Sequence, residues 1–208
     1  MRSMAPDLSR AALCAGVVLL AGCEAIGRPP VRGPDVADER YGFRATFPAG
    51  FRICDSSGSL SMVRGYHQTF EERPPRCDSI RQETAPGMGL IATDAPGAAM
   101  EQLRRELCPV EVPAAERSAG VESLVIDGRT SVSCQARNTD GSYTVAVATL
   151  ARMTRDPAAP ADAPPRIVLY QAGLNTDAGR IAKDLPVFRA FLTTIEIDPP
   201  EWRAGPAN

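Results

Sequence analysis

The chain has 208 residues, of which 23 are Lys or Arg and 25 are Asp or Glu, which gives a formal net charge of −2 at pH 7. This length is enough for one ordinary domain with a hydrophobic core. A nearly neutral chain without a clustered basic segment does not favour binding to nucleic acid, whose phosphates require a basic surface.

The first 22 residues have the pattern of an export signal. Arg2 and Arg10 flank a short polar start, and the apolar run 11–21 that follows is too short to span a bilayer as a permanent helix. The run ends in Leu20-Ala21-Gly22-Cys23. This ending resembles the lipobox of bacterial lipoproteins, and the resemblance implies cleavage before Cys23 and acylation of Cys23.

This resemblance implies a location. We expect a palmitoylated lipoprotein of the bacterial cell envelope that faces the periplasm and is held by its acyl chains, because no polybasic segment follows the anchor. Glu24 stands where many inner-membrane lipoproteins carry Asp, which favours the outer over the inner membrane. The alternative is an ordinary secretory signal with Cys23 at its boundary by chance.

Four cysteines remain when residues 1–22 and the acylated Cys23 are set aside, an even number in an oxidising compartment. The sequence does not fix their pairing, and we favour the pairs that are close in sequence, Cys54–Cys77 and Cys108–Cys134. Zinc sites usually show paired ligands at short spacing, which this chain lacks. We therefore expect two disulfides and neither a metal nor a cofactor.

Residues 23–38 are rich in Pro, Gly and charge, which predicts that the lipidated Cys23 is followed by a disordered tether. A single domain is expected at 39–198. Its first predicted strand, 41–47, alternates apolar with polar or small residues. A turn at Pro48-Ala49-Gly50 leads to a second predicted strand at 51–54.

A third strand is predicted at 60–66, and a long polar loop follows at 68–78. A loop of this length inside a domain is usually functional or held by a cross-link, and Cys77 offers the cross-link. Further strands are predicted at 79–83 and 88–92.

The middle of the chain predicts a helix and a meander. Asp94 is expected to cap a helix that has Pro96 in its first turn and ends by Cys108. Two Asp-Gly turns then predict successive hairpins. Their strands are expected at 124–126, 130–137 and 143–150.

The last part begins with a Pro- and Ala-rich loop at 155–165 and an apolar strand at 166–173, which we expect to be central in the sheet. The last helix is predicted to begin near Asp177 and to be interrupted or restarted at Asp184-Leu185-Pro186. A short closing strand is expected at 195–197.

The predicted fold class is α+β, with an antiparallel β-sheet (meander) flanked by two or three helices and a C-terminal tail at 199–208. Phe47-Pro48-Ala49-Gly50, Ile126-Asp127-Gly128 and an Ile-x-Ile ending at 195–197 mark this order. Over residues 41–198 it resembles the PsbP/Mog1-like fold, which includes envelope lipoproteins of the DcrB type. The resemblance implies an assembly factor, adaptor or chaperone rather than an enzyme.

The sequence indicates no catalytic residues. His67 is the only histidine, so a Ser-His-Asp mechanism would have to use it, and no Gly-x-Ser-x-Gly motif surrounds the nearby serines. Neighbouring glutamates such as Glu71-Glu72 rarely face one substrate from two sides, as glycoside hydrolysis requires.

We therefore expect a non-enzymatic, membrane-anchored protein that binds an envelope protein partner as an adaptor or assembly factor. The first alternative is a small envelope hydrolase or cell-wall-acting enzyme, and the second is a small-ligand-binding lipoprotein. The candidate partner contact is the aromatic and charged loop that follows the third strand. Its residues are Tyr66, His67, Phe70, Glu71, Glu72 and Arg73.

Overall fold

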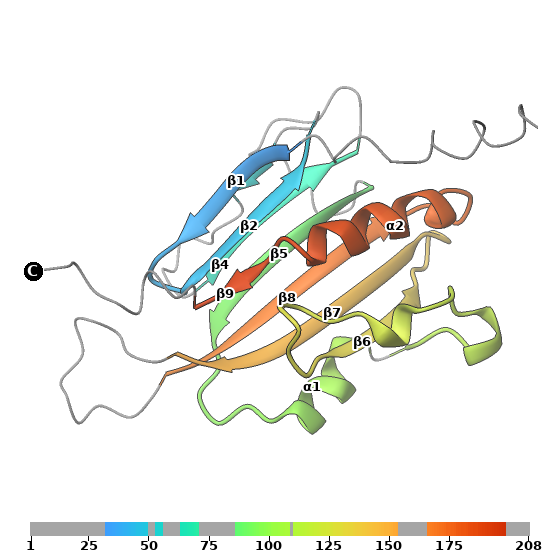
Figure 1. Ribbon diagram of the computed structural model, residues 1–208. Helices are drawn as coiled ribbons and strands as arrows, with labels where there is room; N and C mark the ends of the chain where they lie inside the picture. Colours follow the sequence, from blue (N-terminus) through green and yellow to red (C-terminus); the bar gives the residue numbers. More distant parts are fainter. Residues whose placement is uncertain are drawn as a thin grey trace, which may run out of the picture. The chain divides into compact units, whose positions relative to one another are not determined.

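The computed structural model describes residues 32–49, 53–55, 63–70, 86–108, 110–153 and 166–198. The described residues form two antiparallel β-sheets with two α-helices (Figure 1). This confirms the α+β class and the antiparallel sheet. The predicted signal peptide, 1–22, and the predicted tail, 199–208, lie outside the described residues.

The larger sheet has six strands in the order β3-β4-β5-β8-β7-β6, and each pair of neighbours is antiparallel. β8 is central, as predicted, and β6 and β7 form the second predicted hairpin. The strands are β3 (Ile53–Asp55), β4 (Val63–Thr69), β5 (Gly87–Asp94), β6 (Val132–Arg137), β7 (Tyr143–Arg152) and β8 (Ile167–Thr176).

A smaller sheet contains β1 (Arg32–Asp38), β2 (Phe43–Pro48) and β9 (Glu196–Ile197), with β2 in the middle. β1 corrects the prediction of a disordered tether for 32–38, because these residues form a strand, and residues 23–31 lie outside the described residues. Pairing with β2, from Asp35 opposite Thr46 to Asp38 opposite Phe43, supplies the stability that the polar β1 segment lacks by itself. An edge strand also tolerates proline.

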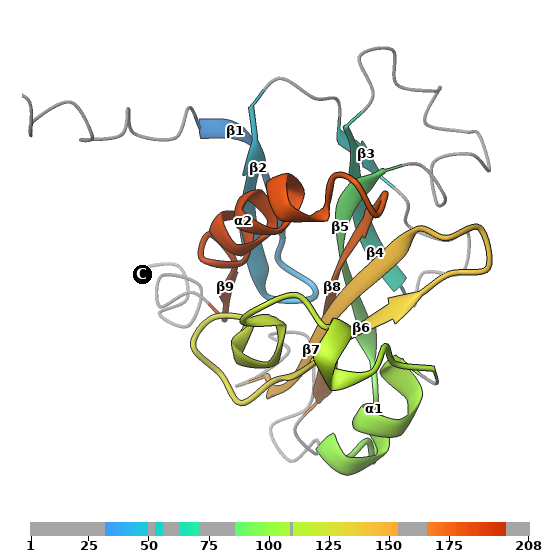
Figure 2. The ribbon, with the colours of Figure 1, turned by 90° about the vertical axis from the view of Figure 1, so that its right-hand side faces the viewer.

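The hydrophobic core lies between one face of the larger sheet and a cover made of the smaller sheet and helix α2 (Ile181–Leu192) (Figure 2). Aromatic residues of β2 connect these layers. Phe47 packs on Phe191 of α2 with ring centroids 4.4 Å apart, and Phe43 meets Tyr170 of β8 edge-on at 6.1 Å.

α2 runs unbroken through Pro186, so the predicted interruption at Asp184-Leu185-Pro186 is wrong. It begins at Ile181, and a turn precedes it. Pro186 removes one main-chain hydrogen bond. Burial of Leu185 and Phe188 on either side of the proline holds the helix on the core despite this loss.

Helix α1 (Met100–Leu107) begins later than predicted. Asp94 does not cap it, because Asp94 ends β5 and its carboxylate pairs with Arg166. The residue at the cap is Ala99, whose side chain cannot accept a hydrogen bond.

The predicted strand 124–126 is also absent. Two 3₁₀ turns, η2 (Ala114–Glu116) and η3 (Val121–Ser123), come before residues 124–126. Asp127 and Gly128, at φ 51° and 63°, form the predicted tight turn, but only β6 continues from it.

Two early strands extend past their predicted ends. β3 (Ile53–Asp55) overlaps the predicted strand 51–54 and β4 (Val63–Thr69) overlaps the predicted strand 60–66, and residues 51–52 and 60–62 lie outside the described residues. Gln68, predicted to begin a polar loop, is a buried strand residue whose Nε2 donates to the carbonyl of Pro48 at 2.7 Å. The predicted strand 79–83 lies outside the described residues.

Cys108 and Cys134 form a disulfide with their Cα atoms 6.2 Å apart, which confirms that predicted pair. Cys54 is also disulfide-bonded. Its predicted partner Cys77 lies outside the described residues, so the pair Cys54–Cys77 stays a prediction.

Candidate interaction face on the larger sheet

The structure separates the residues predicted to contact a partner. Tyr66 and His67 are consecutive in β4, so their side chains point to opposite faces of the sheet. Tyr66 turns to the core, where its ring meets Phe43 edge-on at 6.1 Å. Phe70 is buried beneath the guanidinium of Arg180. The other predicted members, Glu71, Glu72 and Arg73, lie outside the described residues.

His67 lies on the outer face, which we define as the face of the larger sheet that points away from α2. The strand registers align the residues of this face in rows. One row is Cys54, His67, Gly89, Gly173, Ala146 and Cys134. The next row is Gly65, Ile91, Gln171, Ala148 and Val132.

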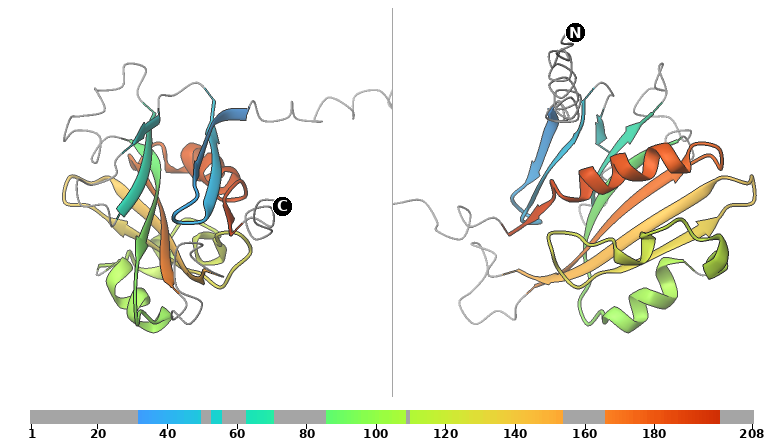
Figure 3. Two further views of the ribbon diagram at one scale, coloured as in Figure 1. Left: turned by 90° about the vertical axis from the view of Figure 1, so that its left-hand side faces the viewer. Right: turned by 45° about the vertical axis from the view of Figure 1, so that its right-hand side comes forward.

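α1 covers the β6 and β7 part of the outer face (Figure 3). The disulfide from Cys108, just after α1, to Cys134 of β6 holds the helix there. The two cysteines and Ala146 form a small apolar cluster that is separate from the main core. This cluster identifies α1 as the only described cover on that side of β6 and β7.

Exposure changes between β7 and the two strands beyond it. In the second row, Val132 and Ala148 are 4% and 0% exposed, whereas Gln171 is only partly buried and Ile91 is 41% exposed. In the first row, Cys134 is buried and Gly173 is only partly buried. The cover provided by α1 therefore ends at β7.

The outward positions of β5 and β8 carry no charged side chain, although 23% of the chain is charged. We call the partly exposed centre of this area the β5–β8 lane. Its exposed member is Ile91, and exposed apolar surface without charge is a candidate for contact with another protein. The lane consists of Gly89, Ile91, Leu169, Gln171 and Gly173.

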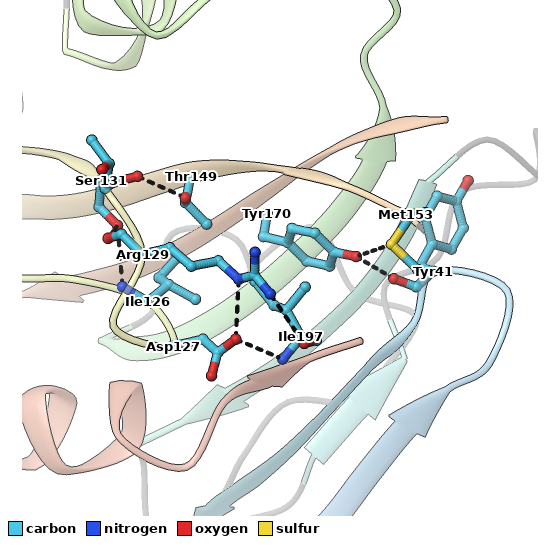
Figure 4. A network of polar contacts seen from close by, with 10 residues as sticks. Tyr41, Ile126, Asp127, Arg129, Ser131, Thr149, Met153, Tyr170 and Ile197 are labelled. Atoms are coloured by element: carbon cyan, nitrogen blue, oxygen red, sulfur yellow. Dashed lines mark hydrogen bonds and ion pairs between the residues drawn. The ribbon is translucent and has the colours of Figure 1, made fainter. Parts of the chain in front are cut away.

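Polar groups on the core side of the sheet have a different role (Figure 4). Asp127 accepts from Arg129 at 3.1 Å and from the Ile197 amide at 3.3 Å, and Arg129 donates to the Ile197 carbonyl at 3.3 Å. Both main-chain groups of Ile197 are therefore bound, and these two side chains fix the closing strand β9.

A second set of contacts fixes the turn between β1 and β2. The carbonyls of Arg40, Tyr41 and Gly42 accept, in that order, from Arg166, the Tyr170 hydroxyl and the amide of Asp198. Burial raises the pKa of Tyr170 strongly, and the nearby Arg129 and Arg166 oppose this shift only in part. These polar groups hold main-chain segments, so their arrangement is explained by the fold.

The described part of the chain contains no group of three or more His, Cys, Asp or Glu residues that could hold a metal ion. Within the same ranges, no helix is both long and apolar enough to cross a membrane. The serines near His67 in sequence and the glutamate pair considered for glycoside hydrolysis lie outside the described ranges. They are Ser56, Ser57, Ser59, Ser61, Glu71 and Glu72.

Ile91, which is exposed, and Leu169, which is partly buried, are not predicted from the sequence to reach the surface. The segments that contain them, 88–92 and 166–173, have apolar residues at successive positions. Such runs predict strands that are buried on both faces. No signal in the sequence indicates that the cover on one face stops at β7.

No protein-family model matches this chain, and no curated protein sequence matches it.

Proposed function

We propose that this protein is a lipid-anchored lipoprotein of the bacterial envelope that binds an envelope protein and acts, without enzymatic activity, as an adaptor or assembly factor. The Leu20-Ala21-Gly22-Cys23 ending of its apolar N-terminal run supports the anchor on Cys23. Placement in the outer rather than the inner membrane is part of the same proposal.

The uncharged β5–β8 lane is the observation that carries the binding function. It combines the exposed Ile91 with the partly buried Leu169 and Gln171, and among the described residues of the larger sheet Ile91 is the exposed large hydrophobic one. An apolar surface of this kind fits the surface of another protein better than it fits a charged metabolite.

We also propose the PsbP/Mog1-like, DcrB-type relationship for residues 41–198. An antiparallel sheet with flanking helices supports it. β1 lies before the residues over which the resemblance runs, and the Cys108–Cys134 disulfide is not part of the general family pattern.

The anchor is tested with the full chain expressed in a bacterial envelope. Cys23→Ser is expected to abolish labelling with radioactive palmitate and to move the protein from the membrane to the soluble fraction. Palmitate labelling that persists in Cys23→Ser would contradict the anchor.

The binding function is tested by chemical crosslinking of envelopes and affinity capture of the full chain. Ile91→Glu is expected to reduce capture of a specific partner, because it puts a charge into an apolar contact. Val187→Glu is the matched control, since Val187 is 37% exposed and lies on α2. Equal capture by both variants would contradict the placement of the binding surface on the outer face.

A further inference from the structure

We infer that the Cys108–Cys134 disulfide is a redox-sensitive attachment of α1, and that its reduction by a dithiol releases the helix and uncovers the outer face of β6 and β7. The inference goes beyond the proposed function, because it depends neither on the lipid anchor nor on a partner. Three features of the structure support it: the weak packing of α1, the position of both cysteines, and the apolar residues beneath the helix.

α1 has little besides the disulfide to hold it on the sheet. It has eight residues, and Leu103 is the one that it buries. A helix this short is marginal in water by itself. Its exposed positions include four charged residues, which gain nothing from contact with an apolar sheet. They are Glu101, Arg104, Arg105 and Glu106.

The dependence of the helix on the disulfide also works in the other direction. Docking of α1 brings Cys108 to Cys134, so the free energy of docking adds to the stability of the disulfide. Packing that contributes little to docking contributes equally little to that stability. The disulfide should therefore be reduced more readily than one whose two cysteines the core holds together in the reduced protein.

The reductant is a dithiol, such as a protein of the envelope that carries two reduced cysteines. A thiolate of the dithiol attacks one sulfur of the disulfide, forms a mixed disulfide with it and releases the other cysteine as a thiolate. The second thiol of the reductant then displaces the remaining cysteine. Two electrons and two protons pass to Cys108 and Cys134, and the reductant leaves as a disulfide.

Access to the sulfurs requires local opening of α1, because both cysteines are buried. Cys108 is at the end of the helix where opening begins. α1 ends at Leu107, and Val110, just beyond the cysteine, is 72% exposed. Weak packing of the helix makes such opening frequent, so the same property exposes the disulfide and makes its loss consequential.

Release of α1 changes the surface of the outer face. Ala146 forms the small apolar cluster with the two cysteines, and Val132 and Ala148 are buried in the neighbouring row. These residues of β6 and β7 are apolar, so the reduced protein exposes an apolar area that the oxidised protein covers. Reduction thus converts a closed part of the sheet into an open one.

The first test reduces the full chain, purified in mild detergent, with dithiothreitol and measures hydrogen exchange. Exchange in 100–107 should become faster by about tenfold or more, because α1 no longer stays on the sheet. Residues 181–192 of α2 are the internal control and should exchange slowly in both states. Slow exchange in 100–107 after reduction would overturn the inference.

The second test measures the coupling between the helix and the disulfide. Ala99, at the N-terminal cap of α1, is exposed and extended, and its side chain makes no capping hydrogen bond. Ala99→Asp supplies such a cap and stabilises the helix. If reduction releases α1, this added stability is present in the oxidised protein alone. The ratio of squared reduced to oxidised glutathione at which half of the protein is reduced should then rise about fivefold.

Ala182→Asp is the matched control, because Ala182 is exposed and lies on α2, which the disulfide does not hold. It should leave the half-reduction ratio unchanged. Alkylation followed by mass spectrometry reads Cys108 and Cys134 separately from Cys54. Equal ratios in Ala99→Asp and Ala182→Asp would mean that α1 remains docked in the reduced protein, and a disulfide that glutathione does not reduce would contradict its lability. Either result overturns the inference.

Discussion

Tyr170 connects the centre of the larger sheet to the turn between β1 and β2. Its hydroxyl donates to the carbonyl of Tyr41 and lies 3.2 Å from the Met153 sulfur. The ring is fully buried, so neither the hydroxyl nor the carbonyl could be hydrated if the other were lost. Removal of the hydroxyl would leave the Tyr41 carbonyl buried without this hydrogen bond, and an unsatisfied buried group lowers the free energy of unfolding.

Tyr170→Phe is therefore expected to lower the free energy of unfolding at pH 7 by about 1–3 kcal/mol, measured by urea denaturation. Because burial raises the pKa of Tyr170, its contribution is complete below the unfolded-state value of about 10 and is lost as the pH rises above it. The difference between wild type and variant should shrink from pH 9 to pH 11. A constant difference would contradict this assignment, and Tyr143→Phe is the control for a partly exposed tyrosine.

Gly42 combines two constraints, a φ of 59° and direct contact with Met153, whose Cε a Cβ on Gly42 would overlap. Gly42→Ala should be destabilised both by the left-handed backbone, which costs about 1–2 kcal/mol, and by displacement of Met153. Gly97→Ala isolates the backbone contribution, because Gly97 has a φ of 76° and open space around it. Thermal unfolding should show a larger loss for Gly42→Ala, and equal losses would contradict the packing part.

At the scale of the elements, α1 depends on its cross-link more than α2 does. α1 has eight residues, and Leu103 is the one that it buries, whereas α2 buries Leu185, Phe188 and Phe191 among others. Isolated helices shorter than about 12 residues are marginal in water. Attachment to β6 through Cys108 therefore accounts for the position of α1 on the outer face.

A variant with Cys108→Ser and Cys134→Ser tests this dependence. We expect a loss of about 2–4 kcal/mol in the free energy of unfolding, because the disulfide closes a loop with a sequence separation of 26. Hydrogen exchange should become fast in 100–107 and remain slow in 181–192, which serves as the internal control. Unchanged exchange in α1 would mean that packing alone holds it.

At the scale of the whole molecule, the larger sheet has two unlike faces. One face is covered by the smaller sheet and α2, and on the other face the described cover is α1, which lies over β6 and β7. Neighbouring residues of one strand therefore have different environments, since Leu90 is fully buried and Ile91 is 41% exposed.

Leu90→Glu and Ile91→Glu measure this difference between the faces. Leu90→Glu buries an unpaired charge and should prevent folding or lower the melting temperature severely. Ile91→Glu should change the free energy of unfolding by about 0.5 kcal/mol or less, as is usual for surface positions. Circular dichroism during thermal unfolding distinguishes them. A severe loss in Ile91→Glu would mean that Ile91 is part of the core.

Local patterns predicted several elements correctly. β6, β7 and the turn at Asp140-Gly141 follow from period-two alternation around a turn sequence, and α1 follows from Met100, Leu103 and Leu107 at helical spacing. The predictions that were wrong depended on distant partners. β1 exists because β2 pairs with it.

The unbroken α2 is a second example. Contact with the core compensates for the hydrogen bond that Pro186 removes, and no local pattern of the sequence indicates how strong that contact is.

The candidate site was predicted less well than the fold. The aromatic and charged character of the segment after Tyr66 suggested a contact loop, but strand geometry turns Tyr66 to the core and His67 away from it, and Phe70 is buried. The residues of the β5–β8 lane have the composition of any central strand, so exposure and not composition distinguishes them.

The sequence by itself determined the α+β class and the order of most elements, because these follow from periodicity and turn residues, and it favoured the Cys108–Cys134 pair without fixing it. Only the tertiary structure decided that residues 32–38 form a strand, which face each strand residue occupies and that α1 covers β6 and β7. These properties depend on contacts between segments far apart in the chain. The free energy of such contacts can exceed the helix and strand propensities of the residues that make them.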